Sequence, residues 1–154
     1  MKKAKHMTLG ILVGGGPAPG INSVISAATI EAARNGAKVY GIMDGYKWLV
    51  KGDVSKVQEL KINEVSRIHF SGGSILRTSR ENPRSTPDGI KKCLESLRKI
   101  GITHLISIGG DDTATSAYHL WKESKGTLKI AHVPKTIDND LPLPPFVNTF
   151  GYQS

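Results

Sequence analysis

The chain has 154 residues, which is enough for one domain with a real hydrophobic core. Its net charge of +8 favours anionic partners, but the basic residues are scattered. Polyphosphate or sugar-phosphate substrates are therefore expected ahead of nucleic acid, with a solvated basic surface as the simpler alternative. A single cysteine excludes an intramolecular disulfide and a cysteine metal cage. The basic start precedes an apolar run too short for a signal peptide or a membrane span, so we expect a cytoplasmic protein with no membrane partner.

The first part of the chain alternates between strand and helix patterns. Residues 8–13 form an apolar run without alternation, which is typical of a strand buried on both faces. A loop rich in glycine and proline follows at 14–20, and apolar residues then recur at helical spacing over 21–35. Residues 38–43 resume as a strand. This unit predicts a parallel sheet with a right-handed crossover.

The middle of the chain, residues 44–68, is less regular. We expect three short elements there: a helical plug at 48–50, a strand at 57–60 and a helix at 62–68. A polar loop follows and places Arg77 and Arg80 among glycine and serine residues. Planar guanidinium groups suit bidentate contacts to phosphate oxygens, although two solvated arginines would explain the same pattern.

The second half contains the clearest helix pattern. Thr86 is a suitable N-cap, Pro87 suits the first helical position, and Gly101 is expected to end the helix. Cys93 falls within this helix and is expected to be a small core residue. A strand at 102–108, a helix at 113–124 and a strand at 129–133 follow. The alternation predicts an α/β fold, a doubly wound, mainly parallel sheet with helices on both faces.

The end of the fourth expected strand is the strongest candidate for a site. Gly109 and Gly110 remove side chains where a buried strand stops, so a ligand could approach the backbone closely. Asp111 and Asp112 then place two carboxylates at the carboxyl end of that strand. Thr113 could cap the next helix and leave free N–H groups aimed at the same point. A plain strand-to-helix turn with an acidic first turn is the alternative.

Two further loops are expected at the same edge of the sheet. The loop at 14–20 has neither the glycine spacing of a dinucleotide fingerprint nor the Gly-Lys-Ser/Thr of a P-loop. Its glycine N–H groups can still cradle a phosphate, although a tight structural turn explains them equally well. After the last strand, Lys135 and Thr136 can hold an anionic group, while Asp138 or Asp140 could accept a proton. An Asx-rich turn is the alternative there.

Together, these loops bring glycine N–H groups, a carboxylate suited to a metal, cations and a candidate base to one edge of the sheet. These are the components of magnesium-assisted phosphoryl transfer to an alcohol, in which positioning and charge neutralisation supply most of the catalysis. Neither a GxSxG elbow nor an HExxH motif occurs, and the histidines lack a shared spacing. Hydrolase and zinc-enzyme functions therefore have little support.

The chain resembles the phosphofructokinase family in four segments, which occur in the family's order and at its spacing. They are Gly-Gly-Pro-Ala-Pro-Gly-Ile-Asn at 15–22, Gly-Gly-Ser-Ile-Leu-Arg-Thr-Ser-Arg at 72–80, Gly-Gly-Asp-Asp-Thr at 109–113 and Pro-Lys-Thr-Ile-Asp-Asn-Asp at 134–140. The resemblance implies the N-terminal, Rossmann-like part of a phosphofructokinase. Family members continue well beyond this point, so residues 1–154 are expected to form an incomplete donor-binding domain without the sugar-phosphate half. Such a piece should be inactive and poorly stable alone, with apolar sheet surface exposed.

Two positions make the chain most similar to the pyrophosphate-dependent branch of the family. ATP-using members usually have Gly-Gly-Asp-Gly, whereas Asp112 replaces the last glycine here, and its carboxylate would crowd and repel the α-phosphate of a nucleotide. ATP-using members also tend to have Pro-Gly-Thr-Ile-Asp, whereas Lys135 replaces the glycine here, and its ammonium can bind pyrophosphate. Repulsion of one donor combined with attraction of another is a common way to build specificity.

The resemblance also implies a role for each site residue. Asp138 would be the general base on the C1 hydroxyl of fructose 6-phosphate, and Asp111 would hold Mg²⁺. Lys135 and Arg80 would act on the phosphoryl group in transfer. Thr136 and Asp140 would lie beside the base at the sugar phosphate. The implied donor-binding residues are Gly15, Gly16, Arg80, Gly110, Asp112, Thr113 and Lys135.

The implied activity is transfer of a phosphoryl group from pyrophosphate to fructose 6-phosphate, in glycolysis and its reversal. An ATP-dependent 6-phosphofructokinase is the alternative within the same class. A non-catalytic phosphate-binding fragment or regulatory subunit is the alternative outside it, although such a subunit has little need for both Asp111 and Asp138. The resemblance suggests a homodimer or homotetramer for the full-length protein.

Overall fold

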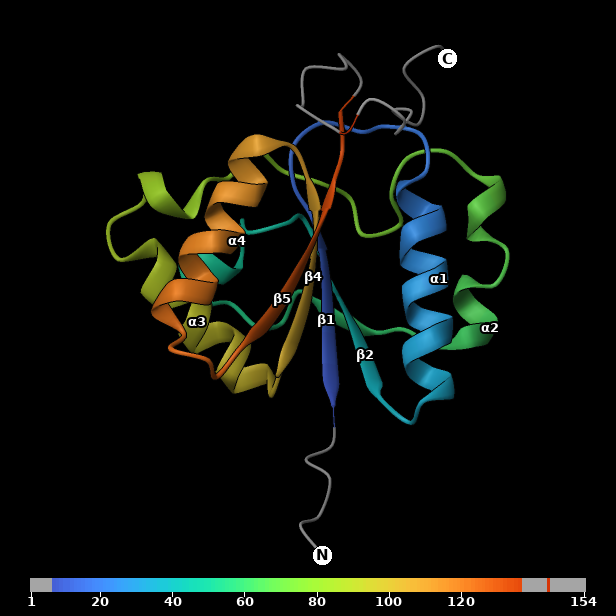
Figure 1. Ribbon diagram of the computed structural model, residues 1–154, viewed down its shortest axis with the longest axis horizontal. Coiled ribbons are helices and arrows are strands. Elements are labelled where there is room, and N and C mark those ends of the chain that lie inside the picture. The colour runs from blue at the N-terminus through green and yellow to red at the C-terminus, as the bar shows by residue number, and fades with distance from the viewer. Residues whose placement is uncertain (1–6, 137–143, 145–154) are drawn as a thin grey trace, which may run out of the picture.

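The computed structural model describes residues 7–136 and residue 144. Its centre is a five-stranded sheet with the strand order β3-β2-β1-β4-β5, and helices pack on both faces (Figure 1). The strands are β1 (Thr8–Val13), β2 (Lys38–Ile42), β3 (Val57–Glu59), β4 (His104–Gly109) and β5 (Lys129–Pro134). The helices are α1 (Ile21–Arg34), α2 (Ile62–Val65), α3 (Gly89–Ile100) and α4 (Asp111–Glu123), with 3₁₀ turns η1 (Leu49–Lys51), η2 (Ile68–Phe70) and η3 (Pro83–Ser85).

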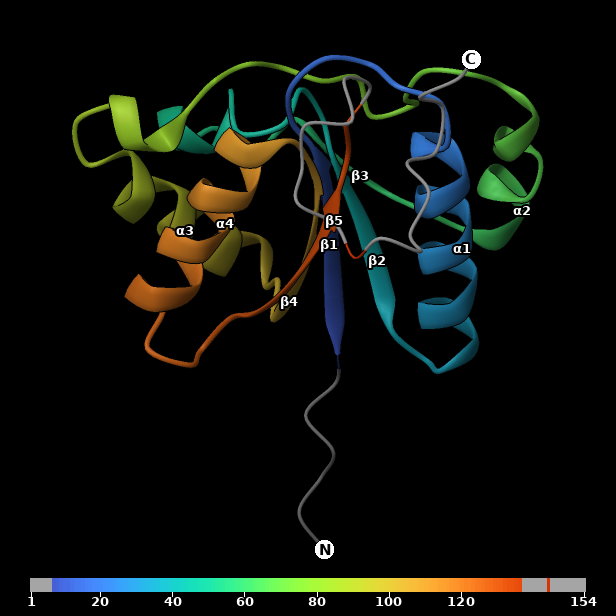
Figure 2. The ribbon, with the colours of Figure 1, turned by 45° about the horizontal axis from the view of Figure 1, so that its top comes forward.

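The sheet is mainly parallel. β1 pairs in parallel with β2 on one side and with β4 on the other, and β5 continues in parallel beside β4. Among the described strands only β3 runs antiparallel, beside β2. α1 and α2 lie on one face of the sheet and α3 and α4 on the other, as both ribbon views show (Figures 1 and 2). The doubly wound α/β fold predicted from the sequence is therefore confirmed.

Two hydrophobic clusters, one on each face, explain why β1 shows no alternation in sequence. Leu9, Ile11 and Val13 pack in the cluster beneath α1, whereas Leu12 packs in the cluster beneath α3 and α4. Successive side chains of a strand point to opposite faces, so a strand buried on both faces needs apolar residues throughout. Cys93 is a core residue of the second cluster, as predicted, and burial raises the pKa of its thiol to about 12.

The strands β1 and β4 lie side by side, but the chain leaves them toward opposite faces. It passes from β1 into α1 on one face of the sheet and from β4 into α4 on the other. Such a switch opens a crevice outside the carboxyl ends of the two strands, which is the usual ligand site of an open α/β sheet. The fold thus brings the loops that follow β1 and β4 to one place.

The predicted start of the third helix is wrong. α3 begins at Gly89 and not at Pro87, and its N-cap is Asp88, which has a positive φ of 55°. The predicted cap, Thr86, uses its hydroxyl elsewhere, donating to the Glu81 carboxylate at 3.1 Å. The backbone N–H of Gly89 closes a turn onto the Thr86 carbonyl at 2.9 Å. The side-chain bond therefore holds residue 86 in a turn that precedes the helix.

The irregular middle of the chain matches the prediction in part. η1 and β3 lie where a helical plug and a short strand were expected. The expected helix at 62–68 is wrong in extent, because α2 ends at Val65 and η2 forms a separate turn from Ile68. The element types in this region were thus easier to predict than their bounds.

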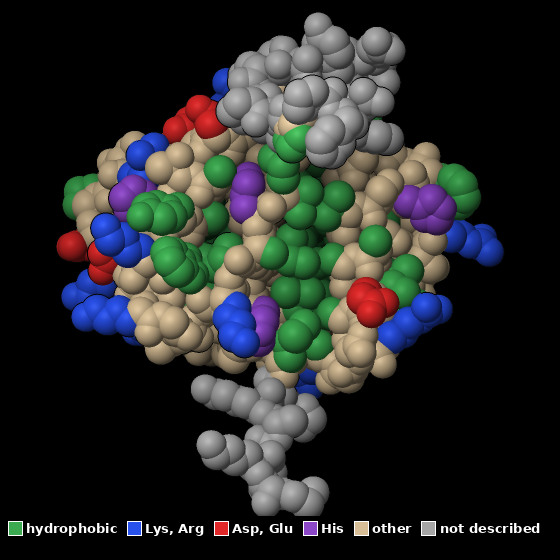
Figure 3. All heavy atoms as spheres, viewed as in Figure 1, with side chains coloured by type: hydrophobic (Ala, Val, Ile, Leu, Met, Phe, Trp, Pro, Cys, Tyr) green, Lys and Arg blue, Asp and Glu red, His purple; other side chains and the backbone are tan. Residues whose placement is uncertain are grey.

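One face of the sheet is partly open. An apolar groove of about 510 Å³ runs over β4 and β5 beside α1, and Met7, Ile106 and Ile130 are among the residues that line it. Figure 3 shows hydrophobic side chains gathered in the middle of this view. The groove leaves apolar side chains of the sheet partly uncovered, and the expected poor stability of the chain alone stays a prediction. None of the described helices is long and apolar enough to cross a membrane.

Candidate functional site

A polar pocket of about 350 Å³ lies at the carboxyl ends of β1 and β4. Segments distant in sequence meet there: the glycine loop after β1, the arginine loop, the start of α4 and the segment after β5. The predicted site residues that line this pocket are Gly15, Gly16, Arg80, Gly110, Asp111, Asp112, Thr113, Lys135 and Thr136. Asp138 and Asp140, the predicted base and its neighbour, lie outside the described residues.

The loop after β1 is held in place by neighbouring segments. Gly15 has a left-handed φ of +81°, and its N–H donates to the Ser79 carbonyl at 2.9 Å. The Thr78 hydroxyl donates to the Gly15 carbonyl, and the Lys135 ammonium donates to the Gly16 carbonyl at 2.8 Å. Since the N–H of Gly15 is already bonded, a phosphate cradle at this loop would use backbone N–H groups from Gly16 onward.

The start of α4 projects directly into the pocket. The helix begins at Asp111 with Gly110 as N-cap, so Thr113 lies in the first turn, and the prediction that it caps the helix is wrong. A Cβ at Gly14 would lie 2.4 Å from Thr113 Oγ1, and a Cβ at Gly109 would lie 2.5 Å from the same atom. Gly109 therefore makes room for Thr113. The expectation that it makes room for a ligand is wrong. Of Gly109 and Gly110, only Gly110 is open to a ligand.

The pocket combines a helix N-terminus with two cations. The first N–H bonded within α4 is that of Ala114, which donates to the Gly110 carbonyl at 2.9 Å, so the N–H groups before it are free of intrahelical partners. Arg80 and Lys135 both line the pocket. Arg77, from the same loop as Arg80, has a positive φ of 56°, is exposed and is not among the lining residues. A helix dipole and two cations together favour a phosphate ligand.

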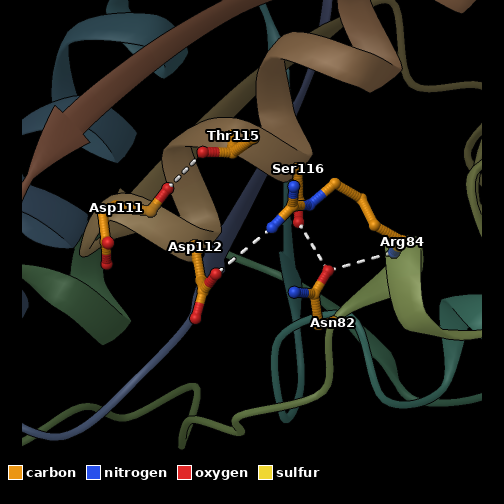
Figure 4. A network of polar contacts seen from close by, with 6 residues as sticks. All are labelled: Asn82, Arg84, Asp111, Asp112, Thr115 and Ser116. Carbon is orange, nitrogen blue, oxygen red and sulfur yellow. Dashed lines mark hydrogen bonds and ion pairs between the residues drawn. The ribbon is translucent and has the colours of Figure 1, made fainter.

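The two carboxylates at the start of α4 have different surroundings (Figure 4). Asp112 forms an ion pair with Arg84, with 3.3 Å between Oδ1 and the guanidinium nitrogen. Among the residues drawn in Figure 4, no contact joins the Asp111 carboxylate to Arg84. The two residues, which look equivalent in sequence, therefore differ in structure: the charge of Asp112 has a nearby counter-charge, and Asp111 remains at the pocket apart from that pair.

The network of hydrogen bonds around this ion pair was not predicted from the sequence. The Asn82 side-chain oxygen accepts from the Arg84 backbone N–H at 3.0 Å and from the Ser116 hydroxyl at 3.3 Å (Figure 4). An asparagine before a proline is a turn signal, so its local role in η3 was within reach of the sequence. Its bond to α4 was not, because the partner is 34 residues away. The network joins the arginine loop to the helix that bears Asp112.

The family model for phosphofructokinase matches residues 8–154, nearly the whole chain. The chain belongs to the phosphofructokinase family. It is 60% identical over 146 residues to the pyrophosphate–fructose 6-phosphate 1-phosphotransferase of Thermotoga maritima, a match covering 95% of this chain and 35% of that relative. The protein of the same name from Naegleria fowleri is 52% identical, covering 96% and 34%. The ATP-dependent 6-phosphofructokinase of Halalkalibacterium halodurans is 39% identical, covering 95% and 43%.

Solved structures of phosphofructokinases share the fold. The Pichia pastoris phosphofructokinase in the T-state matches with a TM-score of 0.80 and 29% identity, over 97% of this chain and 17% of that one. A pyrophosphate-dependent phosphofructokinase from Marinobacter aquaeolei matches with a TM-score of 0.75 over 89% of this chain and 35% of that one, and at 21% identity it supports the fold alone. The chain thus spans about a third of the length of its pyrophosphate-dependent relatives.

The phosphofructokinase resemblance implies Mg²⁺, and the donor set of the pocket suits that ion. Among the described residues, no group of three or more His, Cys, Asp or Glu side chains could enclose a metal. Mg²⁺ does not need such a cage, since it usually keeps several waters and binds through one or two carboxylates together with substrate phosphates. Asp111, which lines the pocket and lies apart from the Arg84 ion pair, fits the part of that protein carboxylate.

Proposed function

We propose that this chain forms the phosphoryl-donor side of a Mg²⁺-dependent phosphotransferase that uses pyrophosphate and fructose 6-phosphate. The main support is that Lys135, Arg80 and the N-terminus of α4 surround one pocket whose wall also includes Asp112. The two cations and the helix N-terminus would attract a compact polyphosphate. The Asp112 carboxylate would stand in the path of a longer donor. The relatives at 60% and 52% identity bear the name of this activity.

In the proposed reaction, the C1 hydroxyl of fructose 6-phosphate attacks the terminal phosphorus of pyrophosphate. A new C1–O–P linkage forms, the P–O–P bond breaks, and orthophosphate leaves with the bridging oxygen. The hydroxyl proton passes to Asp138, which remains a proposal because it lies outside the described residues. A bound Mg²⁺ would offset the negative charge of the donor oxygens. The product is fructose 1,6-bisphosphate.

The residues of this chain would contribute mainly by positioning the donor and balancing its charge. The Lys135 ammonium, 2.8 Å from the Gly16 carbonyl, lies where the glycine loop meets the pocket and can neutralise charge on the phosphoryl group in transfer. Arg80 can contact the same group through its planar fork. Thr136 would lie beside the acceptor sugar. Such preorganised charges usually supply the largest share of catalysis in phosphoryl transfer.

An ATP-dependent 6-phosphofructokinase is the second candidate, because a relative of that name is 39% identical over 95% of this chain. The two candidates share the fold and the proposed base, and they differ in the donor. A non-catalytic phosphate-binding or regulatory role is the third, and it predicts binding without turnover. We further propose that the full-length protein acts in the cytoplasm, in glycolysis and its reversal, as a homodimer or homotetramer.

The decisive experiment measures Mg²⁺-dependent formation of fructose 1,6-bisphosphate by the full-length protein, with pyrophosphate and ATP as separate donors. We expect turnover with pyrophosphate and little with ATP. Turnover with ATP alone would replace the proposal with the ATP-dependent candidate. Absence of turnover with either donor, together with measurable pyrophosphate binding, would favour the non-catalytic role.

The proposed base has its own test. Asp138→Asn keeps the shape of the side chain but cannot accept a proton, so turnover should fall by about 10²–10⁴-fold while the affinity for pyrophosphate stays nearly unchanged. Asp88→Asn on the full-length protein is a matched control, because Asp88 lies at the start of α3, outside the pocket. Normal turnover in Asp138→Asn would mean that another group takes the proton.

A further inference from the structure

The Arg84–Asp112 ion pair stands between two neighbouring pockets. Asp112 lines the polar pocket described above, whereas Arg84 lines a second pocket of about 480 Å³ between η3, α3 and α4. The two pockets are neighbours along η3 and along α4. Asn82 and Ser116 belong to the first, and Arg84 and His119, each a short step further along the same elements, belong to the second. The ion pair therefore joins a residue that lines the first pocket to a residue that lines the second.

The ion pair also resolves a conflict in the charge of the first pocket. A bare carboxylate at Asp112 would repel pyrophosphate as well as any longer donor, because both bring highly charged phosphate oxygens to the same place. The Arg84 guanidinium lies 3.3 Å from Asp112 Oδ1, so a positive charge stands beside that carboxylate while the volume of the Asp112 side chain remains. In the proposal below, this counter-charge weakens the repulsion by Asp112 that was expected to exclude nucleotides.

The pair has little to do with stability. The Asp112 side chain is 77% exposed and that of Arg84 is 37% exposed, and exposed ion pairs contribute only slightly to folding. The two elements that bear the pair are nevertheless linked to each other. Asn82 accepts the backbone N–H of Arg84 and the hydroxyl of Ser116, so the element that bears Arg84 is bonded to the helix that bears Asp112. A pair that joins two linked elements at the pocket and contributes little to stability suggests a role at the site.

We propose that Arg84 is a specificity-determining residue: by pairing with Asp112 it builds a neutral wall that limits the donor to the length of pyrophosphate. The proposal rests on the proposed phosphotransferase function and deepens it. A donor with two phosphates ends at the wall. A nucleoside triphosphate needs to continue past it, with its nucleoside in the second pocket, whose lining mixes apolar Ile90 with charged side chains. In this proposal, the wall excludes a nucleoside triphosphate by blocking its path. The charge balance between Arg84 and Asp112 allows pyrophosphate to bind.

Two substitutions of Asp112 separate closure from repulsion in the full-length enzyme. Asp112→Asn removes the charge and keeps the volume and an oxygen that can accept from Arg84. Asp112→Gly removes both. We expect Asp112→Asn to stay selective for pyrophosphate, while Asp112→Gly raises kcat/KM with ATP by about tenfold or more. If Asp112→Asn gains ATP turnover as fully as Asp112→Gly, charge repulsion is the filter and the proposal is overturned.

Substitutions of Arg84 test the charge balance. Arg84→Ala leaves Asp112 without its counter-charge, so the KM for pyrophosphate should rise about tenfold with little change in kcat. Arg84→Lys keeps a cation and should restore most of the affinity. Lys122→Ala removes an equal charge from the exposed far end of α4 and serves as the matched control. An unchanged KM in Arg84→Ala would overturn the proposal, as would an equal rise in Lys122→Ala.

Failure of this inference is distinguishable from failure of the proposed function. If the wild-type protein turns over no donor, the function itself is wrong. A second outcome is that the wild-type protein uses pyrophosphate while the Arg84 and Asp112 variants behave as their controls. In that case the proposed function is supported, and the proposed role of the Arg84–Asp112 pair is wrong. A combined variant, Asp112→Gly with Arg84→Ala, adds a further check, because loss of Arg84 should no longer weaken pyrophosphate binding once Asp112 is absent.

Discussion

The turns after β1 and β4 reach the same pocket but are built in opposite ways. β1 continues through a loop of residues 14–20 before α1 begins, and the N-cap Gly20 forms no side-chain cap bond. β4 passes into α4 through Gly110 alone, with Asp111 already helical. The tight turn is positioned by the strand and the helix that it joins. The long loop is positioned by bonds from other segments, to Ser79, Thr78 and Lys135.

The difference shows that the pocket has a rigid side and a tethered side. On the rigid side, the carboxylates follow from local geometry, because a helix that starts one residue after a strand has little freedom. On the tethered side, the glycine backbone depends on contacts between residues far apart in the chain. The two sides join where Thr113 packs between Gly14 and Gly109. Substitutions at that joint, at the tether and beneath the rigid side should therefore have different effects.

The largest stability effect is expected at the joint. Gly14→Ala would place a Cβ 2.4 Å from Thr113 Oγ1. Because neither the strand end nor the helix start can move easily, the free energy of unfolding should fall by about 2 kcal/mol. Thermal melting of the full-length protein measures this. Adding Thr113→Ala removes the clashing oxygen and should recover much of the loss. Gly16→Ala is the control, because a Cβ there meets nothing within 4 Å. Equal melting of Gly14→Ala and Gly16→Ala would contradict the packing described.

A large effect on activity, with little effect on stability, is expected at the tether. Lys135→Met keeps the length of the side chain and removes the ammonium that donates to the Gly16 carbonyl. Turnover with pyrophosphate should fall about 10²-fold, because both the loop position and a charge on the donor are lost. Melting should shift only slightly. Lys129→Met, on β5 away from the pocket, is the matched control, and a similar loss of turnover in that variant would argue against a local role for Lys135.

The smallest effect on stability is expected from a fall in pH, which acts on the β4–β5 pair that supports the rigid side. His132 on β5 contacts the Ser107 hydroxyl on β4 through Nδ1 at 3.0 Å, and burial lowers the pKa of its ring. The unfolded chain therefore binds a proton at higher pH than the folded one. Stability is full above the ordinary pKa of 6.5 and is lost as the pH falls toward the lower folded value. The loss between about pH 7.5 and 5.5 should be about 1 kcal/mol or less.

The control for the acid effect replaces the ring. His132→Gln should flatten part of the dependence of the melting temperature on pH. It should not abolish it, because burial also lowers the pKa of His104, which remains. His69→Gln, at an exposed position on η2, should leave the dependence unchanged. If the melting temperature of His132→Gln depends on pH as that of the wild-type protein does, protonation of His132 is not the cause of the acid effect.

The features predictable from sequence were those in which cause and effect lie close together in the chain. The buried run at 8–13, the glycine loop after it and the helix spacing that follows are local patterns, and they were sufficient for the α/β class and for a parallel sheet. The meeting of site residues at one pocket followed from a general rule, since the carboxyl ends of parallel strands share one edge of the sheet. The roles of Asp138 and Asp140 remain predictions.

Tertiary structure alone decided which side chains meet. Asp111 and Asp112 look alike in sequence, and only the folded chain gives one of them Arg84 as a partner, 28 residues away. Gly109 looks like an opening for a ligand, and only packing shows that Thr113 fills it. Local preferences depend on a few neighbouring residues, so the sequence by itself determined the elements and their order. Contacts between elements depend on how the sheet orders its strands and on which rotamers then fit, and no short stretch of sequence contains that information.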